Sequence, residues 1–130
     1  MANITKSTSK VKVLYGEGDS EVLEKQSVTI KQAGYDVIPV EGRQQVQDAL
    51  RRESFDLVIL GATLTKNDRH HLPYMVKKSQ PEAKVLVTHT DGEGHHAVDA
   101  TLETGRSMNA FLEKIASLYP QQAAGKAAGK

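Results

Sequence analysis

Histidines and carboxylates are the residues of this 130-residue chain whose types could do chemistry, because imidazole and carboxylate groups together bind zinc, nickel or copper. The histidines are His70, His71, His89, His95 and His96, and the acidic residues expected near them are Glu17, Asp19, Asp68, Asp91 and Glu93. The histidines lack a regular ligand spacing such as His-x3-His. The alternative to a metal site is a solvent-exposed loop edge that gains positive charge on mild acidification, because histidine titrates near neutrality. We expect no native metal; Glu17, Asp19 and His89 are the candidate ligands if one binds.

Other reactive patterns in the sequence are incomplete. Gly16-x-Gly18 follows an apolar strand, as in a dinucleotide-binding loop, but the third glycine is missing and Asp19 would repel a phosphate. Thr88 and His89 are adjacent, yet neighbours along a strand point to opposite faces, so they do not form a nucleophile and its base. The chain has no cysteine, which excludes disulfides and thiolate chemistry. We therefore predict no enzymatic activity and no cofactor.

Length and charge limit the organisation and the partners. One domain suits a chain of 130 residues, and we expect it over residues 11–120, with a flexible arm at 1–10 and a disordered tail at 121–130. The formal net charge of +1 gives no broad attraction to nucleic acid or membrane. The N-terminal residues are polar and lack the apolar stretch of a secretory signal. The sequence therefore predicts a cytoplasmic protein with no nucleic-acid or membrane partner.

The elements that must position these residues alternate between strands and helices. Asp19 or Ser20 can cap the first helix, and Gly34 can end it. Pro39 predicts that the second strand lies at a sheet edge or ends early. Pro73 predicts that the helix beginning at Asn67 or Asp68 is short. The expected strands cover residues 11–15, 35–40, 55–60, 84–88 and 99–103, and the other expected helices cover residues 20–33, 44–53 and 108–118.

This alternation predicts an α/β fold with right-handed crossovers and a doubly wound parallel sheet of five strands in the order 2-1-3-4-5. In such sheets, ligands bind beyond the carboxyl ends of the strands. The segments expected there are Gly16–Ser20, Gly61–Asp68 and His89–Val98. Any functional site should therefore be built from these three segments.

Four segments, taken together in their order along the chain, resemble the segments of a known protein family. They are Lys12-Val13-Leu14-Tyr15, Gln32-Ala33-Gly34-Tyr35-Asp36-Val37, Phe55-Asp56-Leu57-Val58-Ile59-Leu60 and Lys84-Val85-Leu86-Val87-Thr88. Over about residues 11–119 the chain resembles the receiver domains of two-component response regulators. The resemblance implies a flavodoxin-like, receiver-like fold. Only Thr90 to Val98 lie between the expected fourth and fifth strands, so we expect the family's fourth helix to be shortened or absent.

The chain departs from this family at its reactive positions. The phospho-acceptor aspartate of the family corresponds to Gly61, and the two acidic residues that hold a divalent cation correspond to Glu17 and Gly18. The family's lysine corresponds to Glu103 or Thr104, so Thr88 alone remains of the reactive set. The resemblance therefore implies a vestigial pocket. Its residues are Glu17, Gly18, Asp19, Gly61, Thr63, Thr88 and Glu103.

The expected function is that of a non-catalytic pseudo-receiver in two-component, phosphorelay-type signalling. It would act without phosphorylation, by binding a protein partner, a second copy of itself, or both. The last helix is the expected contact, through Met108, Phe111, Ile115 and Tyr119, although most of its apolar stripe must cover the sheet. One alternative is a small-ligand or metal-binding regulatory domain that uses the histidine-rich edge. Another is phosphotransfer to an unusual acceptor, either Asp68 or Thr63.

Overall fold

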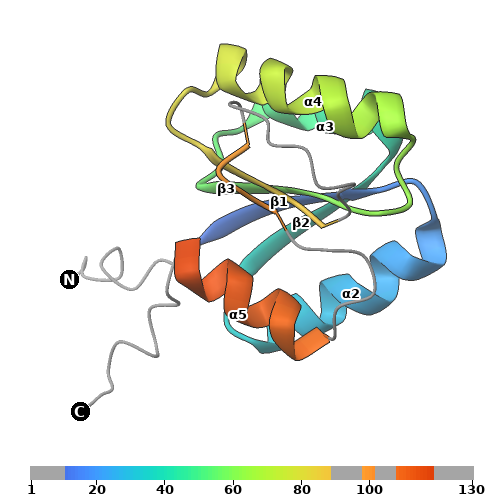
Figure 1. The fold of residues 1–130 in the computed structure, drawn as a ribbon, viewed down its shortest axis with the longest axis vertical. Helices are drawn as coiled ribbons and strands as arrows, with labels where there is room; N and C mark the ends of the chain where they lie inside the picture. Colours follow the sequence, from blue (N-terminus) through green and yellow to red (C-terminus); the bar gives the residue numbers. More distant parts are fainter. Residues whose placement is uncertain (1–10, 89–97, 102–107, 119–130) are drawn as a thin grey trace.

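The computed structural model describes residues 11–88, 98–101 and 108–118. A central sheet lies between two layers of helices, with α3 and α4 on one face and α2 and α5 on the other (Figure 1). The strands are β1 (Lys12–Glu17), β2 (Asp36–Glu41), β3 (Leu57–Leu60), β4 (Lys84–Val87) and β5 (Ala100–Thr101). The helices are α2 (Ser20–Gln32), α3 (Gly42–Arg52), α4 (Lys66–Ser79) and α5 (Met108–Leu118).

The sheet is parallel, and its four longer strands follow the predicted order β2-β1-β3-β4. The fifth strand is represented by two residues, because Ala100 and Thr101 pair with Leu86 and Val87 at the outer side of β4. The predicted loss of the family's fourth helix falls on residues 89–97, which lie outside the described residues. The flavodoxin-like architecture is thus confirmed for the four strands and the helices that cover them.

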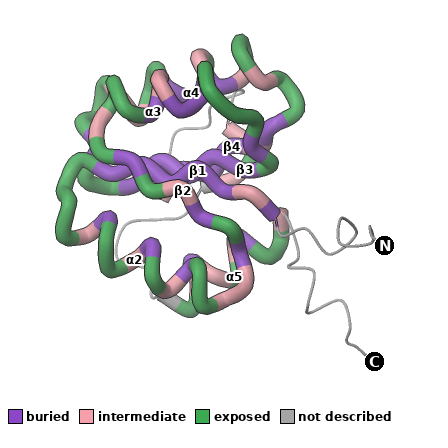
Figure 2. The backbone as a smooth tube through the Cα atoms, turned by 180° about the vertical axis from the view of Figure 1, so that it is seen from behind, coloured by how far each residue is buried: buried purple, intermediate pink, exposed green. Residues whose placement is uncertain are grey.

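Strand β3 forms the centre of the core, because both of its faces are buried. Val58 and Leu60 pack towards α3 and α4, while Leu57 and Ile59 pack towards α2 and α5. Figure 2 shows the same distribution as a buried central layer between helices that are exposed on their outer sides. Burying one such aliphatic side chain contributes about 1.5–3 kcal/mol, so the continuous apolar run fixes the middle of the sheet.

The boundaries of α2 follow from local chemistry. The Asp19 carboxylate accepts a hydrogen bond from the backbone N–H of Glu21 at 2.8 Å, which confirms Asp19 as the N-cap. After the helix, Gly34 adopts a φ of 106°, a left-handed conformation that favours glycine. The helix therefore begins at the predicted residue and ends at Gln32, one residue before the predicted end.

The predictions made from Pro39 and Pro73 have different outcomes. Strand β2 is an edge strand that pairs with β1, as the position of Pro39 predicts. The prediction that Pro73 shortens its helix is wrong, because α4 runs for 14 residues through Pro73. Leu72 and Val76 lie on either side of this proline and are fully buried. Their packing against the sheet holds both halves of the helix in line despite the missing backbone donor.

The first strand is longer than predicted. Strand β1 extends through Gly16 and Glu17, which the sequence placed in a loop, and both residues are buried. A Cβ at Gly16 would lie 2.8 Å from Cγ2 of Val46, so a residue without a side chain lets α3 pack closely on the strand. The extension places the carboxylate of Glu17 inside the fold, whereas the sequence predicted it in a loop.

Candidate functional site

Glu17 lies at the carboxyl end of β1, and its side chain faces the layer of α2 and α5. Alternate residues of a strand share a face, so Glu17 follows Val13 and Tyr15, which both belong to the core on that side. Only 1% of its surface is exposed. An ionisable side chain this deeply buried requires hydrogen-bond partners, and these identify the site.

Gly61 follows β3 directly beside Glu17. The backbone N–H of Gly61 donates to the carbonyl oxygen of Gly16 at 2.8 Å, which continues the β1–β3 ladder by one residue. A Cβ built on Gly61 would overlap all three atoms of the Glu17 carboxyl group. The prediction from the sequence concerned only the side chain of residue 61 itself. Gly61 offers no side-chain oxygen, but the Glu17 carboxylate fills the space that a side chain on residue 61 would need.

Thr63 closes the site from the loop that follows β3. Its backbone N–H and its hydroxyl both donate to Oε1 of Glu17, at 2.9 and 2.6 Å. The same hydroxyl accepts the backbone N–H groups of Gly18 and Asp19, at 2.8 and 2.9 Å. One side chain thus joins the β3–α4 loop to the β1–α2 loop, and its hydroxyl has no remaining hydrogen-bonding capacity.

Tyr15 holds the other oxygen of the carboxylate. Its hydroxyl donates to Oε2 of Glu17 and also contacts the side-chain amide of Gln26. A phenol has a single proton, so we orient the Gln26 amide with its N–H towards the Tyr15 oxygen. Burial, and then the charge of Glu17 and the hydrogen bond to it, raise the pKa of Tyr15 far above its ordinary value. The phenol therefore remains neutral and serves Glu17 as a permanent donor.

Gly18 lies in close contact with the loop that carries Thr63. A Cβ on Gly18 would overlap the carbonyl oxygen of Thr63, because the two loops lie in direct contact at this point. A carboxylate at this position would force the loops apart. The space in which a side chain on residue 18 would begin is thus occupied by the backbone of the opposite loop.

The side chains of the other predicted pocket residues do not join this cluster, although the backbone N–H of Asp19 bonds to Thr63. Asp19 is exposed, and its carboxylate caps α2. Thr88 is partly buried, and its backbone N–H donates to the carbonyl oxygen of Leu60 at 3.0 Å, which extends the β3–β4 ladder. Glu103 lies outside the described residues. The structure therefore brings together Glu17, Gly18, Gly61 and Thr63 and adds Tyr15 and Gln26, which the sequence interpretation missed.

A signal for Tyr15 was present in the sequence. Tyr15 and Glu17 are two residues apart on one strand, so they share a face once β1 is extended to Glu17. The boundary of the strand, placed two residues too early, concealed this relationship. The contribution of Gln26 had no such signal, because it depends on how α2 packs against the sheet.

The predicted metal-binding edge is only partly described. His70 and His71 lie exposed on α4, with ring centroids 5.4 Å apart, whereas His89, His95 and His96 fall outside the described residues. Within residues 11–88, 98–101 and 108–118, no three histidine or acidic side chains gather as they would around a metal ion. Asp68 lies near Arg43, with 3.7 Å between Oδ1 and the guanidinium nitrogen.

The predicted contact helix is largely a core element. Phe111 and Ile115 of α5 are 4% and 0% exposed, and the Phe111 ring lies 6.2 Å from that of Tyr15. These two residues therefore cover the sheet instead of presenting a surface to a partner. The side chain of Met108 and all of Tyr119 lie outside the described part of the chain.

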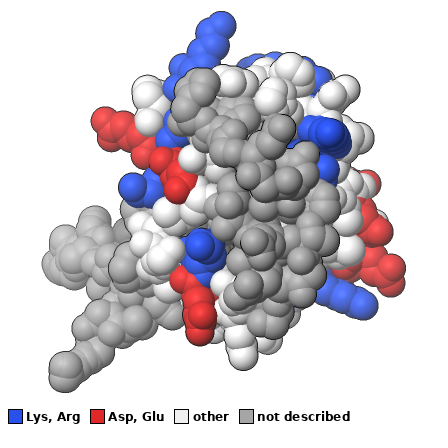
Figure 3. Space-filling model, viewed as in Figure 1, with Lys and Arg blue, Asp and Glu red and all other residues white. Residues whose placement is uncertain are grey.

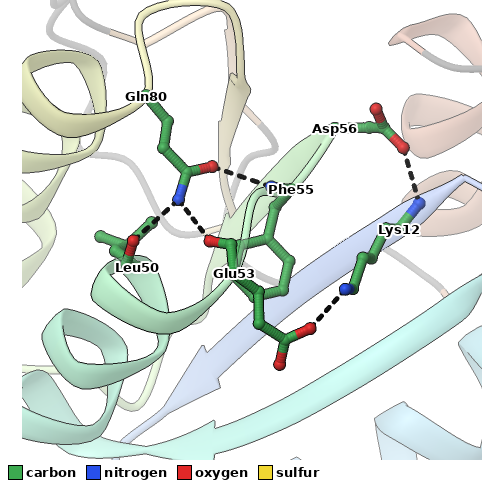
Figure 4. Close-up of polar contacts among 6 residues, drawn as sticks. All are labelled: Lys12, Leu50, Glu53, Phe55, Asp56 and Gln80. Carbon is green, nitrogen blue, oxygen red and sulfur yellow. Dashed lines mark hydrogen bonds and ion pairs between the residues drawn. The ribbon is translucent and has the colours of Figure 1, made fainter.

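A second polar network lies at the opposite end of the sheet and has a structural role (Figure 4). The Gln80 amide accepts the backbone N–H of Phe55 at 2.8 Å and donates to the carbonyl oxygens of Leu50 and Glu53, at 3.0 and 2.7 Å. Beside it, the ammonium group of Lys12 pairs with the Glu53 carboxylate. Gln80, at the end of α4, thus holds the turn between α3 and β3 in place through three hydrogen bonds.

Asp99 holds the short strand β5 near β4. Its carboxylate accepts the backbone N–H of Val85 at 2.8 Å and the Lys77 ammonium group at 2.7 Å. Partial burial alone would raise the pKa of Asp99, but these bonds and the charges of Lys77 and Lys84 outweigh it and hold the pKa below its ordinary value. The pair therefore connects α4 to the edge of the sheet.

Of the comparisons with known proteins, the one with solved structures agrees with this architecture. No protein-family model matches the chain, and no curated protein sequence matches it. Among solved structures, the CheY-like receiver domain protein of Methanospirillum hungatei JF-1 superposes with a TM-score of 0.73 at 20% identity, covering 90% of this chain and 100% of that one. The orphan response regulator HP1043 of H. pylori superposes with a TM-score of 0.69 at 21% identity, covering 83% and 95%.

A third solved structure has the same fold. The response regulator of Burkholderia pseudomallei with a phosphorylated aspartic acid, a calcium ion and citrate has a TM-score of 0.67 at 16% identity, covering 83% of this chain and 66% of that one. Together these likenesses show a receiver-like fold. In addition, none of the described helices has the length and apolar character needed to cross a bilayer.

Proposed function

We propose that this chain is a receiver-like module of two-component signalling that takes up no phosphoryl group at the end of β3 and acts by binding a protein partner or a second copy of itself. The observation that carries the proposal is the position of the Glu17 carboxylate over Gly61. The receiver fold places its reactive groups at this edge of the sheet, and here the position of the acceptor is filled by a buried, fully bonded group.

Phosphoryl transfer needs an oxygen that the donor can approach, with a divalent cation beside it. Both oxygens of Glu17 already accept hydrogen bonds from Thr63 and Tyr15, and the residue is 1% exposed. The Thr63 hydroxyl is equally occupied, because it donates to Glu17 and accepts two backbone N–H groups. Modification of either residue would require the two loops to separate.

The same contacts account for a domain that keeps one conformation without a signal. In a receiver, the loops after the first and third strands surround the cation and the acceptor. Here Thr63 bonds directly to the backbone of Gly18 and Asp19, so the loops are joined by the protein itself. Such a domain offers a partner a constant surface.

Acetyl phosphate with Mg²⁺ tests the first half of the proposal, with intact-mass measurement as the readout. We expect no mass increase, while an aspartate-bearing receiver domain treated in parallel gains one phosphoryl group. A stable adduct that is lost in Glu17→Gln, Thr63→Val or Asp68→Asn would overturn the proposal and would identify the acceptor.

Light scattering after size-exclusion chromatography tests the second half. A dimer whose population is the same with and without acetyl phosphate would support self-association that does not depend on phosphorylation. A shift between monomer and dimer on addition of acetyl phosphate would contradict the proposal.

A further inference from the structure

The two helical layers differ sharply in charge. Helices α3 and α4 carry seven basic and two acidic residues, a formal excess of five positive charges. Helices α2 and α5 carry three basic and three acidic residues, which balance. The basic residues of the first layer are Arg43, Arg51, Arg52, Lys66, Arg69, Lys77 and Lys78. Because the whole chain has a net charge of only +1, this layer is a local concentration of charge.

Most of these cations face solvent. Arg43, Arg51, Arg52, Lys66 and Lys78 are all exposed. Figure 3 shows basic side chains projecting from the upper side of the molecule, where Figure 1 places α3 and α4. Several of the basic residues also have protein partners: Arg69 donates to the carbonyl oxygens of Ala62 and Leu64, and Lys77 pairs with Asp99. Arg51 pairs with Asp48 at 2.7 Å, and a guanidinium nitrogen of Arg43 lies 3.7 Å from Asp68. We call the five exposed cations the basic face.

An exposed aromatic side chain lies on the same layer. Tyr74 of α4 is 42% exposed, and its ring lies 6.2 Å from that of His70 in an edge-to-face arrangement. Tyr74 and Val28 are the large apolar side chains that stand exposed within the described residues. Tyrosine and arginine are enriched at the centres of protein interfaces, where both supply contact area and hydrogen bonds.

We propose that the basic face and Tyr74 dock an acidic segment of a protein partner, an inference that rests on the proposed function as a partner-binding module. The excess of positive charge on this layer favours an acidic segment as the bound partner. Nucleic acid is the less suitable occupant on charge, because the formal net charge of the whole chain is only +1. The sequence pI of about 8.0 also lies below the values above about 9 that are typical of nucleic-acid-binding domains.

Fluorescence anisotropy with the full chain tests this docking surface. The probe is a labelled oligo-glutamate peptide, and a single-stranded oligonucleotide of equal charge is the comparison. We expect saturable binding of the peptide that weakens as salt is raised. The double variant Arg52→Glu, Lys78→Glu should weaken binding about tenfold, because it replaces two attractions with two repulsions at exposed positions.

The matched control carries the same change of charge on the other layer. Lys25→Glu, Lys31→Glu on α2 should change the affinity by less than about twofold if the contact is local. Tyr74→Ser should weaken the peptide without changing the net charge. Equal losses in both double variants, no saturable peptide binding, or a preference for the oligonucleotide would overturn the assignment. The acetyl phosphate experiment is independent of all three outcomes, so a failure here is distinguishable from a failure of the proposed function.

Discussion

Gly61 and Glu17 are interdependent, because the Glu17 carboxylate occupies the space in which any side chain on Gly61 would begin. The glycine makes room for the carboxylate, and the carboxylate satisfies the donors of Thr63 and Tyr15 that surround the vacated space. An aspartate introduced at residue 61 would therefore clash with Glu17, because two carboxylates would compete for one volume.

Gly61→Ala should destabilise the protein by about 1–3 kcal/mol, because even one methyl group overpacks a filled site and displaces a bonded carboxylate. In a Glu17→Ala background the same substitution should cost much less, since the space is then open. Urea unfolding of the four proteins measures this coupling, which we expect to exceed about 1 kcal/mol. Equal costs in the two backgrounds would show that the residues do not share this space.

Thr63→Val should lower the free energy of unfolding by about 1–3 kcal/mol. The valine keeps the shape of the side chain but removes the hydroxyl that donates to Glu17 and accepts from Gly18 and Asp19. Thr63→Ser retains that hydroxyl and is the matched control. Thermal unfolding of both variants should place serine close to the wild type and valine well below it, and the reverse order would refute the role of the hydroxyl.

Gln80→Glu should be more damaging than its size suggests. The glutamate retains an oxygen that can accept from Phe55, but it loses both donations to carbonyl oxygens and places a negative charge beside them. We expect a loss of about 2 kcal/mol in urea unfolding at neutral pH. The loss should shrink at low pH, where a protonated carboxyl can donate to one carbonyl, and a loss that is constant with pH would contradict this account.

Alkaline conditions should unfold the protein through Tyr15. Its pKa is raised in the folded state by burial and by Glu17, so folding keeps the phenol protonated at pH values where the unfolded chain loses the proton. The stability contribution is therefore complete below the ordinary value of 10.0 and declines above it, by about 1.4 kcal/mol for each pH unit. Tyr15→Phe should flatten this decline in urea unfolding between pH 9 and 11, roughly the range around the unfolded pKa.

The order of the elements could be predicted because each rests on local signals. Val46, Ala49 and Leu50 fall on one side of α3, and all three are buried as their spacing predicts. The Asp19 cap and the left-handed Gly34 are equally local. These features need no knowledge of distant parts of the chain.

The closure of the site could not be predicted in this way, because it depends on contacts between loops that are distant in sequence. Glu17 and Thr63 are 46 residues apart, and their hydrogen bonds form only when β1 and β3 lie side by side. The sequence showed that residue 61 has no side-chain oxygen, but it did not show that the Glu17 carboxylate fills the space beside it. Continuation of α4 through Pro73 has a similar cause, since burial of Leu72 and Val76 outweighs a local helix-breaking preference.

Pro39 removes one main-chain hydrogen-bond donor from the edge strand β2, which affects how a partner could attach. The N–H of Asp36 points towards β1, so by alternation the missing donor of Pro39 belongs to the free side of β2. The N–H of Glu41 on that side is already taken by Gln45 at 2.7 Å. An extended peptide would find few main-chain donors along this border, because Pro39 has none and that of Glu41 is taken, which disfavours growth of the sheet by an added strand there.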